Sequence, residues 1–428
     1  MKILYVSQSF FPSTGGVSYY LIWLGRKLRR LGHESAFVNL KASGRPSEET
    51  VEGFRVYRVP REGLMEKDIV QGYTRFKELV LTVFHNRDVP LDRLYNKHLY
   101  GFNEYLKVNK LFEERIREAA DIERPDIIHV HDFQLLPLGT PLKDLGVPIP
   151  FTWHIPFTEE VHENWRHFIV KYLNEYSNSV FSTKPYVNAA LKSGLPWNRV
   201  TCIPPFMDVE EPRVSFRRKF GIGDGDKLIV CVARLDRLKG QSVLVKAASK
   251  LMGRFKLVFI GNGSFSKEIL KVKGKEEYHK ELQEMVMAGG LEGKVFFAGA
   301  IEREMLMAAY KECDVVVLPS IHEGFGLAIA EGMAFGKPVV GTAVGGIPIQ
   351  IWPGVNGFLV PPNDPESLAN AIEHILSNDE VAKRMGENSR RIYQESFSTD
   401  RGVRDHLRLY ERLLGKGTKE AIASRTSP

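Results

Sequence analysis

The sequence predicts an α/β protein made of two domains in tandem, each built on a parallel sheet. Three observations lead to this prediction. The chain has 428 residues, which is enough for two or three domains of ordinary size. Strand-length apolar runs alternate with segments of helical periodicity, an alternation typical of parallel sheets with helical crossovers. A stretch rich in proline and acidic residues, 204–214, interrupts the alternation and divides it into two similar halves.

The first half begins with a buried strand, Lys2–Ser7, and a loop rich in proline and glycine at 11–16. A helix is expected over Val17–Leu31, where apolar residues recur at helical spacing, with Gly32 as its end. Residues 62–118 are rich in charged and aromatic residues and are expected to form a largely helical insertion. Further strands are expected at Ser35–Leu40, Phe54–Val59, Asp126–His131, Ile149–His154, Ser179–Thr183 and Val200–Ile203.

The second half repeats the same alternation. Strands are expected at Leu228–Ala233, Phe255–Ile260, Val295–Ala298, Asp314–Leu318, Pro338–Thr342 and Gly357–Val360. Helices are expected at Ser242–Leu251, Lys280–Ala288, Arg303–Lys311, Gly326–Phe335 and Pro365–Ser377. Ligands bind at the carboxyl ends of the strands in open parallel sheets, so residues at those ends are the candidates for function.

Composition excludes several classes of protein. A chain with 43% hydrophobic and 26% charged residues is neither disordered nor collagen-like. No apolar run approaches the roughly 18 residues of a transmembrane helix, and no secretory signal is seen, which predicts a cytoplasmic protein. The three cysteines, Cys202, Cys231 and Cys313, are scattered, which argues against a disulfide framework or a zinc cluster.

The net charge of +7 favours anionic small molecules as ligands. No nucleic-acid-binding motif is present, so nucleic acid is not expected as a partner. The basic cluster at 26–30 leaves peripheral contact with an anionic membrane open. The oligomeric state cannot be derived from these features.

The stretch from Pro319 to Glu331 carries the strongest chemical signal. A buried strand runs into a glycine-rich turn, and a helix begins near Gly326. The first free N–H groups of that helix, around 325–327, form an anion site that the helix dipole supports. Glu331 can accept two hydrogen bonds from a vicinal diol such as ribose, and Glu323 can face a bound sugar. Alternatively, the two glutamates are charges that only favour the helix dipole.

Two cations follow the first strand of the second half. Arg234 and Lys239 stand where that strand ends, a position that suits a diphosphate. They would stabilise the negative charge that grows as a phosphate leaves. The alternative is a solvated basic turn. In the first half, Gly15 and Gly16 follow the first strand and permit close approach of the backbone to phosphate, although two glycines also suit a tight turn.

A weaker motif, Gly261-Asn-Gly263, follows a strand of the second half. It begins like a dinucleotide fingerprint, yet Ser266 stands where the third glycine is required. It is the basis for one alternative, a nicotinamide-dependent oxidoreductase.

Histidines end two strands of the first half. Asp132 and His154 can form hydrogen bonds with sugar hydroxyls, whereas His129 is expected to be a satisfied core histidine. No H-E-x-x-H pattern accompanies them, so no metal site is expected.

Together these residues resemble glycosyltransferase family 4, the retaining nucleotide-sugar transferases of the GT-B fold, over nearly the whole chain. The family marks are Glu323 and Glu331 at E-x7-E spacing, Arg234 with Lys239-Gly240, Gly15-Gly16, and the glycine-containing stretches 344–348 and 356–360. The chain departs from the family pattern at two places. Pro-Phe-Met-Asp208 stands for the usual N-G-[IV]-D, and Ile349 stands where an acidic residue often follows G-G-x-P.

The resemblance implies a GT-B fold, in which two Rossmann-like domains face each other across a cleft. Residues 1–208, with the insertion at about 62–118, would bind the acceptor, and residues 209–400 would bind the nucleotide sugar. A C-terminal helix at 401–415 would cross back to the first domain, and 416–428 would form a mobile tail.

The resemblance also implies a role for each motif. Glu331 would hold the donor ribose and Glu323 the donor sugar. Arg234 and Lys239 would bind the diphosphate together with Gly16. His154 would contact the transferred sugar, and Asp132 would lie on the acceptor side. The full donor-binding set that it implies is Gly15, Gly16, Gly261, Gly263, Ile301, Gly324, Phe325, Gly326, Leu327 and Glu331.

The predicted activity is retaining transfer of a hexose, with glucose preferred, from a nucleoside diphosphate sugar such as UDP-glucose to a hydroxyl acceptor. The segments 131–134, 153–157, 202–208 and 346–350 are similar to trehalose-forming synthases, which favours a small sugar as acceptor. No cofactor and no metal are expected, because Arg234 and Lys239 supply positive charge. A sugar-nucleotide epimerase, a phosphorylase, a non-catalytic nucleotide-sugar binder and the oxidoreductase are the alternatives.

Overall fold

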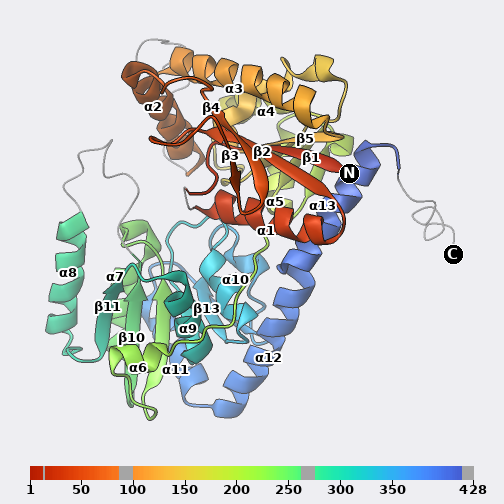
Figure 1. Ribbon diagram of the computed structural model, residues 1–428. Helices are drawn as coiled ribbons and strands as arrows, with labels where there is room; N and C mark the ends of the chain where they lie inside the picture. Colours follow the sequence, from red (N-terminus) through yellow and green to blue (C-terminus); the bar gives the residue numbers. More distant parts are fainter. Residues whose placement is uncertain (13–14, 86–99, 262–274, 417–428) are drawn as a thin grey trace. The chain divides into compact units, whose positions relative to one another are not determined.

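A computed structural model describes residues 1–12, 15–85, 100–261 and 275–416 of the chain (Figure 1). The chain forms two compact units. Unit 1 contains Met1–Phe206 and the segment that begins at Thr399, and unit 2 is Met207–Ser398. The divisions therefore lie after residues 206 and 398, two residues before the predicted ones at 208 and 400 in each case.

Unit 1 is built on an eight-stranded sheet with the order β3-β4-β2-β1-β5-β6-β7-β8. Neighbouring strands pair in parallel, except for the antiparallel hairpin of β3 and β4. The strand bounds are β1 Lys2–Val6, β2 Glu34–Leu40, β3 Glu48–Val51, β4 Phe54–Val59, β5 Ile127–His131, β6 Pro150–Trp153, β7 Asn178–Phe181 and β8 Val200–Cys202.

Helices cover both faces of this sheet (Figure 1). Because side chains alternate along a strand, Leu4 and Val6 face a core with α2, α3 and α4, whereas Ile3 and Tyr5 face a core with α1 and α13. The helices are α1 Gly16–Arg30, α2 Lys67–Phe84, α3 Phe102–Glu123, α4 Glu163–Leu173, α5 Lys184–Lys192 and α13 Thr399–Leu413. Short 3₁₀ turns cover η2 Phe133–Gly139, η3 Lys143–Leu145 and η4 Trp197–Arg199.

Unit 2 is built on a six-stranded, parallel sheet with the order β11-β10-β9-β12-β13-β14. The strands are β9 Lys227–Val232, β10 Phe255–Ile260, β11 Val295–Gly299, β12 Val315–Leu318, β13 Val339–Thr342 and β14 Gly357–Val360. The helices are α6 Phe216–Phe220, α7 Gln241–Ala248, α8 Lys275–Ala288, α9 Arg303–Glu312, α10 Leu327–Ala334, α11 Pro365–Leu376 and α12 Asp379–Ser396, with 3₁₀ turns η5 Arg237–Lys239 and η7 Ile347–Ile349. The predicted fold class, two α/β domains on parallel sheets, is confirmed.

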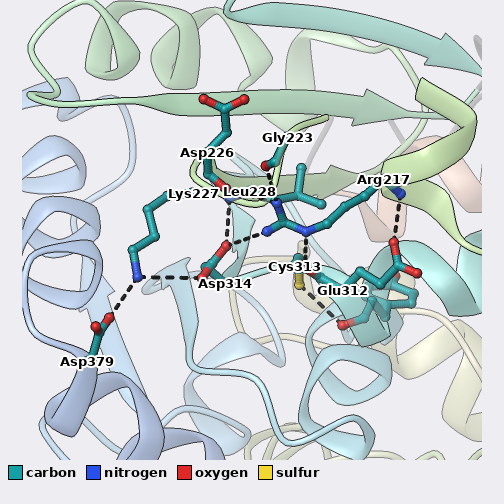
Figure 2. A network of polar contacts seen from close by, with 10 residues as sticks. Arg217, Gly223, Asp226, Lys227, Leu228, Glu312, Cys313, Asp314 and Asp379 are labelled. Atoms are coloured by element: carbon teal, nitrogen blue, oxygen red, sulfur yellow. Dashed lines mark hydrogen bonds and ion pairs between the residues drawn. The ribbon is translucent and has the colours of Figure 1, made fainter. Parts of the chain in front are cut away.

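A polar network anchors the amino-terminal edge of the unit 2 sheet (Figure 2). The Arg217 guanidinium donates to the carbonyl oxygens of Gly223 at 3.0 Å, Asp226 at 2.9 Å and Glu312 at 3.2 Å. It also donates to Asp314 Oδ2 at 3.0 Å. One side chain on α6 therefore holds the beginning of β9, the end of α9 and the beginning of β12 together.

Arg217→Ala is expected to lower the free energy of unfolding of unit 2 by roughly 2–3 kcal/mol, because several partly buried carbonyl and carboxylate acceptors lose their donor. Chemical denaturation followed by circular dichroism measures the change. Arg254→Ala is the matched control. Its side chain is 77% exposed and pairs only with Asp226 among the described residues, so the loss should stay below about 1 kcal/mol. Equal losses in the two variants would contradict the anchoring role of Arg217.

Candidate functional site

Lys239 and Glu323 form an ion pair at the carboxyl end of the unit 2 sheet. Lys239 Nζ lies 2.8 Å from Glu323 Oε2, and both side chains are largely buried. Ser320 Oγ donates to the same oxygen at 3.2 Å, and the N–H of Gly324 donates to Oε1 at 3.1 Å. The pair forms because β9 and β12 are neighbours in the sheet, so the loops that follow them meet. The sequence pointed to each residue separately, and the structure brings them together.

The backbone around this pair is packed so closely that glycine is required. Gly240 has a φ of +67°, and a Cβ there would lie 2.0 Å from the carbonyl oxygen of Pro319. Gly345 has a φ of +53°, and its Cβ would lie 1.7 Å from the carbonyl oxygen of Glu323. The glycines after β9 and β13 thus allow two loops to press against the turn that carries Glu323.

The turn that carries Glu323 ends at α10, whose first N–H groups have no acceptor within the helix itself. Gly326 caps the helix in a left-handed conformation. Within the described residues, the N–H groups of Gly326 and Leu327 donate to no other residue. Phe325 is buried and packs edge-on against Phe397 at 5.6 Å between ring centroids. The arrangement can accept an anion at the predicted position, 325–327.

Glu331 on α10 is held by two side chains that the sequence did not single out. Tyr310 OH donates to Glu331 Oε2 at 2.8 Å, and Arg303 Nη1 lies 3.7 Å from Oε1. Burial raises the pKa of Glu331, while Arg303 and Tyr310 act in the opposite direction. Both partners stand on α9, so only the packing of α9 beside α10 reveals them.

The other residues that were predicted to bind the donor follow neighbouring strands of the sheet. Arg234 follows β9, and its carbonyl oxygen accepts from Gln241 Nε2 at 2.7 Å. Gly261 follows β10, where a Cβ would lie 2.3 Å from the carbonyl oxygen of Ala233. Ile301 follows β11 and is partly exposed. Gly263 lies outside the described residues.

In unit 1, Gly15 and Gly16 begin α1 at the carboxyl end of β1. The carbonyl oxygen of Gly15 accepts from the N–H of Tyr19 at 3.1 Å. A Cβ on Gly15 would meet no described atom within 4 Å. Among the described residues, nothing therefore blocks the close approach of a ligand to the backbone of Gly15 on the side that a Cβ would occupy.

Asp132 and His154 meet at the carboxyl ends of β5 and β6. Asp132 Oδ1 accepts from the N–H of Phe133 at 3.0 Å and from the N–H of His154 at 3.3 Å. Burial raises the pKa of Asp132 to about 6. The non-glycine φ of +72° at Asp132 marks the sharp turn from β5 into η2. The two residues predicted to contact sugar thus share one hydrogen-bonded corner.

Behind this corner lies a buried network of histidines and tyrosines that the sequence did not reveal. His131 Nδ1 and His154 Nε2 share a hydrogen bond of 3.0 Å. His129 bonds to Tyr410 OH at 2.7 Å and to Thr152 Oγ1 at 2.8 Å. Tyr20 OH bonds to His406 Nε2 at 2.9 Å. His129 is fully buried with both ring nitrogens bonded, and the helix that supplies His406 and Tyr410 is α13.

These histidines should make unit 1 sensitive to acid. Burial lowers the pKa of His154 to about 3 and of His406 to about 4, and holds those of His129 and His131 well below the ordinary value. Below about pH 6.5 the unfolded chain binds protons that the folded chain does not, so stability is complete above that pH and falls below it by about 1 kcal/mol per histidine per pH unit. Asp132 opposes this trend weakly, because its raised pKa favours protonation of the folded state.

Urea denaturation at a series of pH values, followed by tryptophan fluorescence, measures the effect, since Trp23, Trp153, Trp165 and Trp197 all belong to unit 1. The variant His406→Gln removes one titrating group and should reduce the slope of stability against pH. An unchanged slope would contradict the assignment of the pH dependence to this network.

The basic cluster at 26–30 is engaged within unit 1. Arg26 pairs with Glu52 at 2.5 Å, Lys27 pairs with Asp400, and Arg29 donates to the carbonyl oxygens of Glu52 and Gly53. Three of the cluster's charges thus contact the protein itself. Across the described ranges, no helix combines the length and apolar character needed to cross a bilayer.

Comparison with known proteins identifies both units. Residues 14–211 match the model of Glycosyltransferase Family 4, and residues 213–392 match the model of Glycosyl transferases group 1. An uncharacterized glycosyltransferase of Methanocaldococcus jannaschii is 26% identical over 96% of this chain and 98% of its own length. The trehalose synthase of Thermococcus litoralis is 26% identical over 85% of this chain and 94% of its own length.

A solved structure agrees with these matches. The Anabaena protein Alr3699/HepE, in complex with UDP-glucose, is 22% identical with a TM-score of 0.66 over 96% of this chain and 100% of its own. The fold and the matched models define the class of protein: it is a glycosyltransferase enzyme with the GT-B fold. The resemblance that rests on Glu323, Glu331 and the glycine motifs is thereby confirmed. Within that class, the two matched models together make the chain a glycosyltransferase of the family 4 type.

Proposed function

We propose that this glycosyltransferase transfers a hexose, with glucose preferred, from a nucleoside diphosphate sugar to a hydroxyl of a small sugar, with retention of the anomeric configuration. The observation that carries the proposal is the Lys239–Glu323 pair, followed in the same turn by the N–H groups of Gly326 and Leu327, which donate to no residue in the part of the chain that the structure describes. A cation and unused amides bind a diphosphate, and a carboxylate next to them can accept from a sugar hydroxyl.

The chemistry follows from charge. The bond between the anomeric carbon and the diphosphate oxygen breaks, and the leaving group gains negative charge that Lys239, Arg234 and the α10 amides stabilise. The acceptor oxygen forms the new bond to the same carbon, and its proton passes to the leaving phosphate oxygen. Leaving and attacking groups share one face, which retains the configuration. Positioning and electrostatic stabilisation supply most of the rate, and no metal is required.

Unit 1 supplies the sugar-contacting residues in this proposal. Asp132 and His154 present a carboxyl group and an imidazole at one corner, and both types of group bind sugar hydroxyls. With a pKa of about 6, the Asp132 carboxylate accepts hydrogen bonds at neutral pH and can also donate once the pH falls to about 6 or below. Gly16 would approach the diphosphate through its backbone.

Two similarities support the choice of substrates. The Anabaena structure of the same fold contains UDP-glucose, which makes UDP-glucose the first donor to test. The Thermococcus litoralis relative is a trehalose synthase, which makes glucose the first acceptor to test.

A substrate screen tests the proposal. UDP-, ADP- and GDP-glucose are each offered with glucose, glucose phosphate or a glycerate derivative, and release of nucleoside diphosphate is measured. The expected result is release that requires an acceptor, with an α-linked product from an α-linked donor by NMR. Free phosphate as the sole acceptor would indicate a phosphorylase instead. Conversion of the donor sugar without nucleotide release would indicate an epimerase, and absorbance changes with a nicotinamide would favour the oxidoreductase.

A further inference from the structure

Gln350 is a fully buried amide inserted between two loops of unit 2. It follows η7, and its side chain is 0% exposed. Its Nε2 donates to the carbonyl oxygen of Phe325 and lies 3.4 Å from those of Gly326 and Gly346. Because three carbonyl oxygens surround this atom, the position requires the NH2 end of the amide. The other end, Oε1, is buried without a hydrogen bond to any described residue.

The carbonyls that Gln350 contacts belong to the peptides that carry the free amides of α10. A trans peptide is planar, so its C=O and its N–H point in opposite directions. Holding the Phe325 carbonyl toward Gln350 therefore directs the N–H of Gly326 away from it. The Gly326 carbonyl and the N–H of Leu327 are related in the same way.

A second set of contacts fixes Gln350 in turn. Its own carbonyl oxygen accepts from Asn356 Nδ2 at 3.0 Å, and the N–H of Gly346 donates to the carbonyl oxygen of Gly324 at 2.9 Å. The loop that carries Gln350 is thus bonded to the glycine-rich turn at several points. A buried amide with one unsatisfied oxygen costs stability, which argues that the position serves more than packing.

We propose that Gln350 is a positioning residue that aims the N–H groups of Gly326 and Leu327 at the diphosphate of the donor. The inference rests on the proposed function, because it assigns a task to the same amides. It predicts that Gln350 affects nucleotide affinity and turnover without touching the nucleotide.

Two substitutions test the role. Gln350→Met keeps the length and removes the donor, so the Kd for UDP should rise about tenfold or more and kcat should fall at least as much. Gln350→Glu places a carboxylate against the carbonyls at neutral pH. A buried carboxyl takes up a proton readily, and its O–H could then donate to Phe325, so activity relative to the wild type should recover at about pH 5.5.

Asn388→Leu is the matched control, because Asn388 Nδ2 donates at 3.0 Å to the carbonyl oxygen of Val355, and among the described residues no hydrogen bond joins Asn388 to the turn 323–327. Calorimetry with UDP, and with ADP and GDP in parallel, is done on folded protein together with Lys239→Ala. A Kd for Gln350→Met equal to that of Asn388→Leu, while Lys239→Ala binds weakly, would overturn this inference alone.

A wild type that binds none of the three nucleotides would overturn the proposed function and the inference with it. If Gln350→Met fails to fold, the positioning role is tested by whether the activity of Gln350→Glu, relative to the wild type, recovers at low pH. A pH profile that parallels the wild type would then refute the positioning role.

Discussion

Lys239→Ala should lower kcat roughly a thousandfold, because in the proposed mechanism the variant removes a preorganised positive charge where the leaving diphosphate becomes more negative. The ion pair with Glu323 fixes the position of the Lys239 ammonium group. In the free enzyme Glu323 holds Lys239 in place at 2.8 Å, and the bound diphosphate would compete for the same ammonium group. Steady-state rates with a saturating donor measure the change.

The controls for Lys239 separate charge from fold. Lys250→Ala removes a lysine that is 45% exposed and paired with Glu366 on the surface, and its rates should stay within about twofold of the wild type. Lys239→Arg keeps the positive charge with a different geometry, so its kcat should lie between those of Lys239→Ala and Lys250→Ala. A Lys239→Ala enzyme with normal rates and a normal melting temperature would refute the assignment of Lys239 to the diphosphate.

Glu331→Ala should raise the donor KM by about a hundredfold or more, because the two hydrogen bonds that the proposed function assigns to the ribose and the Glu331 carboxylate are lost together. The acid limb of kcat/KM should also report Glu331. Its pKa is raised by burial, so it becomes protonated at a higher pH than an exposed glutamate and then accepts fewer hydrogen bonds.

Tyr310→Phe refines this second prediction. It removes the hydroxyl that donates to Glu331 Oε2, which should raise the pKa of Glu331 further and move the acid limb to higher pH. Glu284→Ala is the surface control, since Glu284 is 60% exposed on α8. A donor KM unchanged in Glu331→Ala would show that Glu331 does not hold the ribose.

Much of the fold could be predicted because segments that form or pack against a sheet have apolar residues at regular spacing in the sequence. The central strands β1, β5, β9 and β12 are mostly apolar and almost wholly buried, and they were located within a residue or two at each end. Several elements were missed, among them α4, α5 and α6, and two others show a physical reason for the miss. β3 is a short edge strand with Glu48 and Glu49, and α12 is so polar that few of its residues, among them Met385 and Ile392, mark its buried side.

The candidate site could be predicted only where its functional residues lie close together in the sequence. The turn from Glu323 to Glu331 carries its own signal, because the glycines, the helix start and both carboxylates lie within a few residues of one another. Contacts between segments that are distant in the sequence leave no such signal. Nothing in the sequence marked Tyr310 and Arg303 as partners of Glu331. Gln350 was also missed: it follows Ile349, where the chain departs from the family pattern, and its side chain donates to the carbonyl oxygen of Phe325 in the turn.

The position of α13 has a consequence for how the protein is made. His406 and Tyr410 complete the interior of unit 1 around Tyr20 and His129, yet they are encoded after all of unit 2. During synthesis, the first two hundred residues leave the ribosome long before those two side chains exist. Unit 2 can therefore complete its fold before unit 1, whose core lacks the side chains of His406 and Tyr410 until α13 has been made.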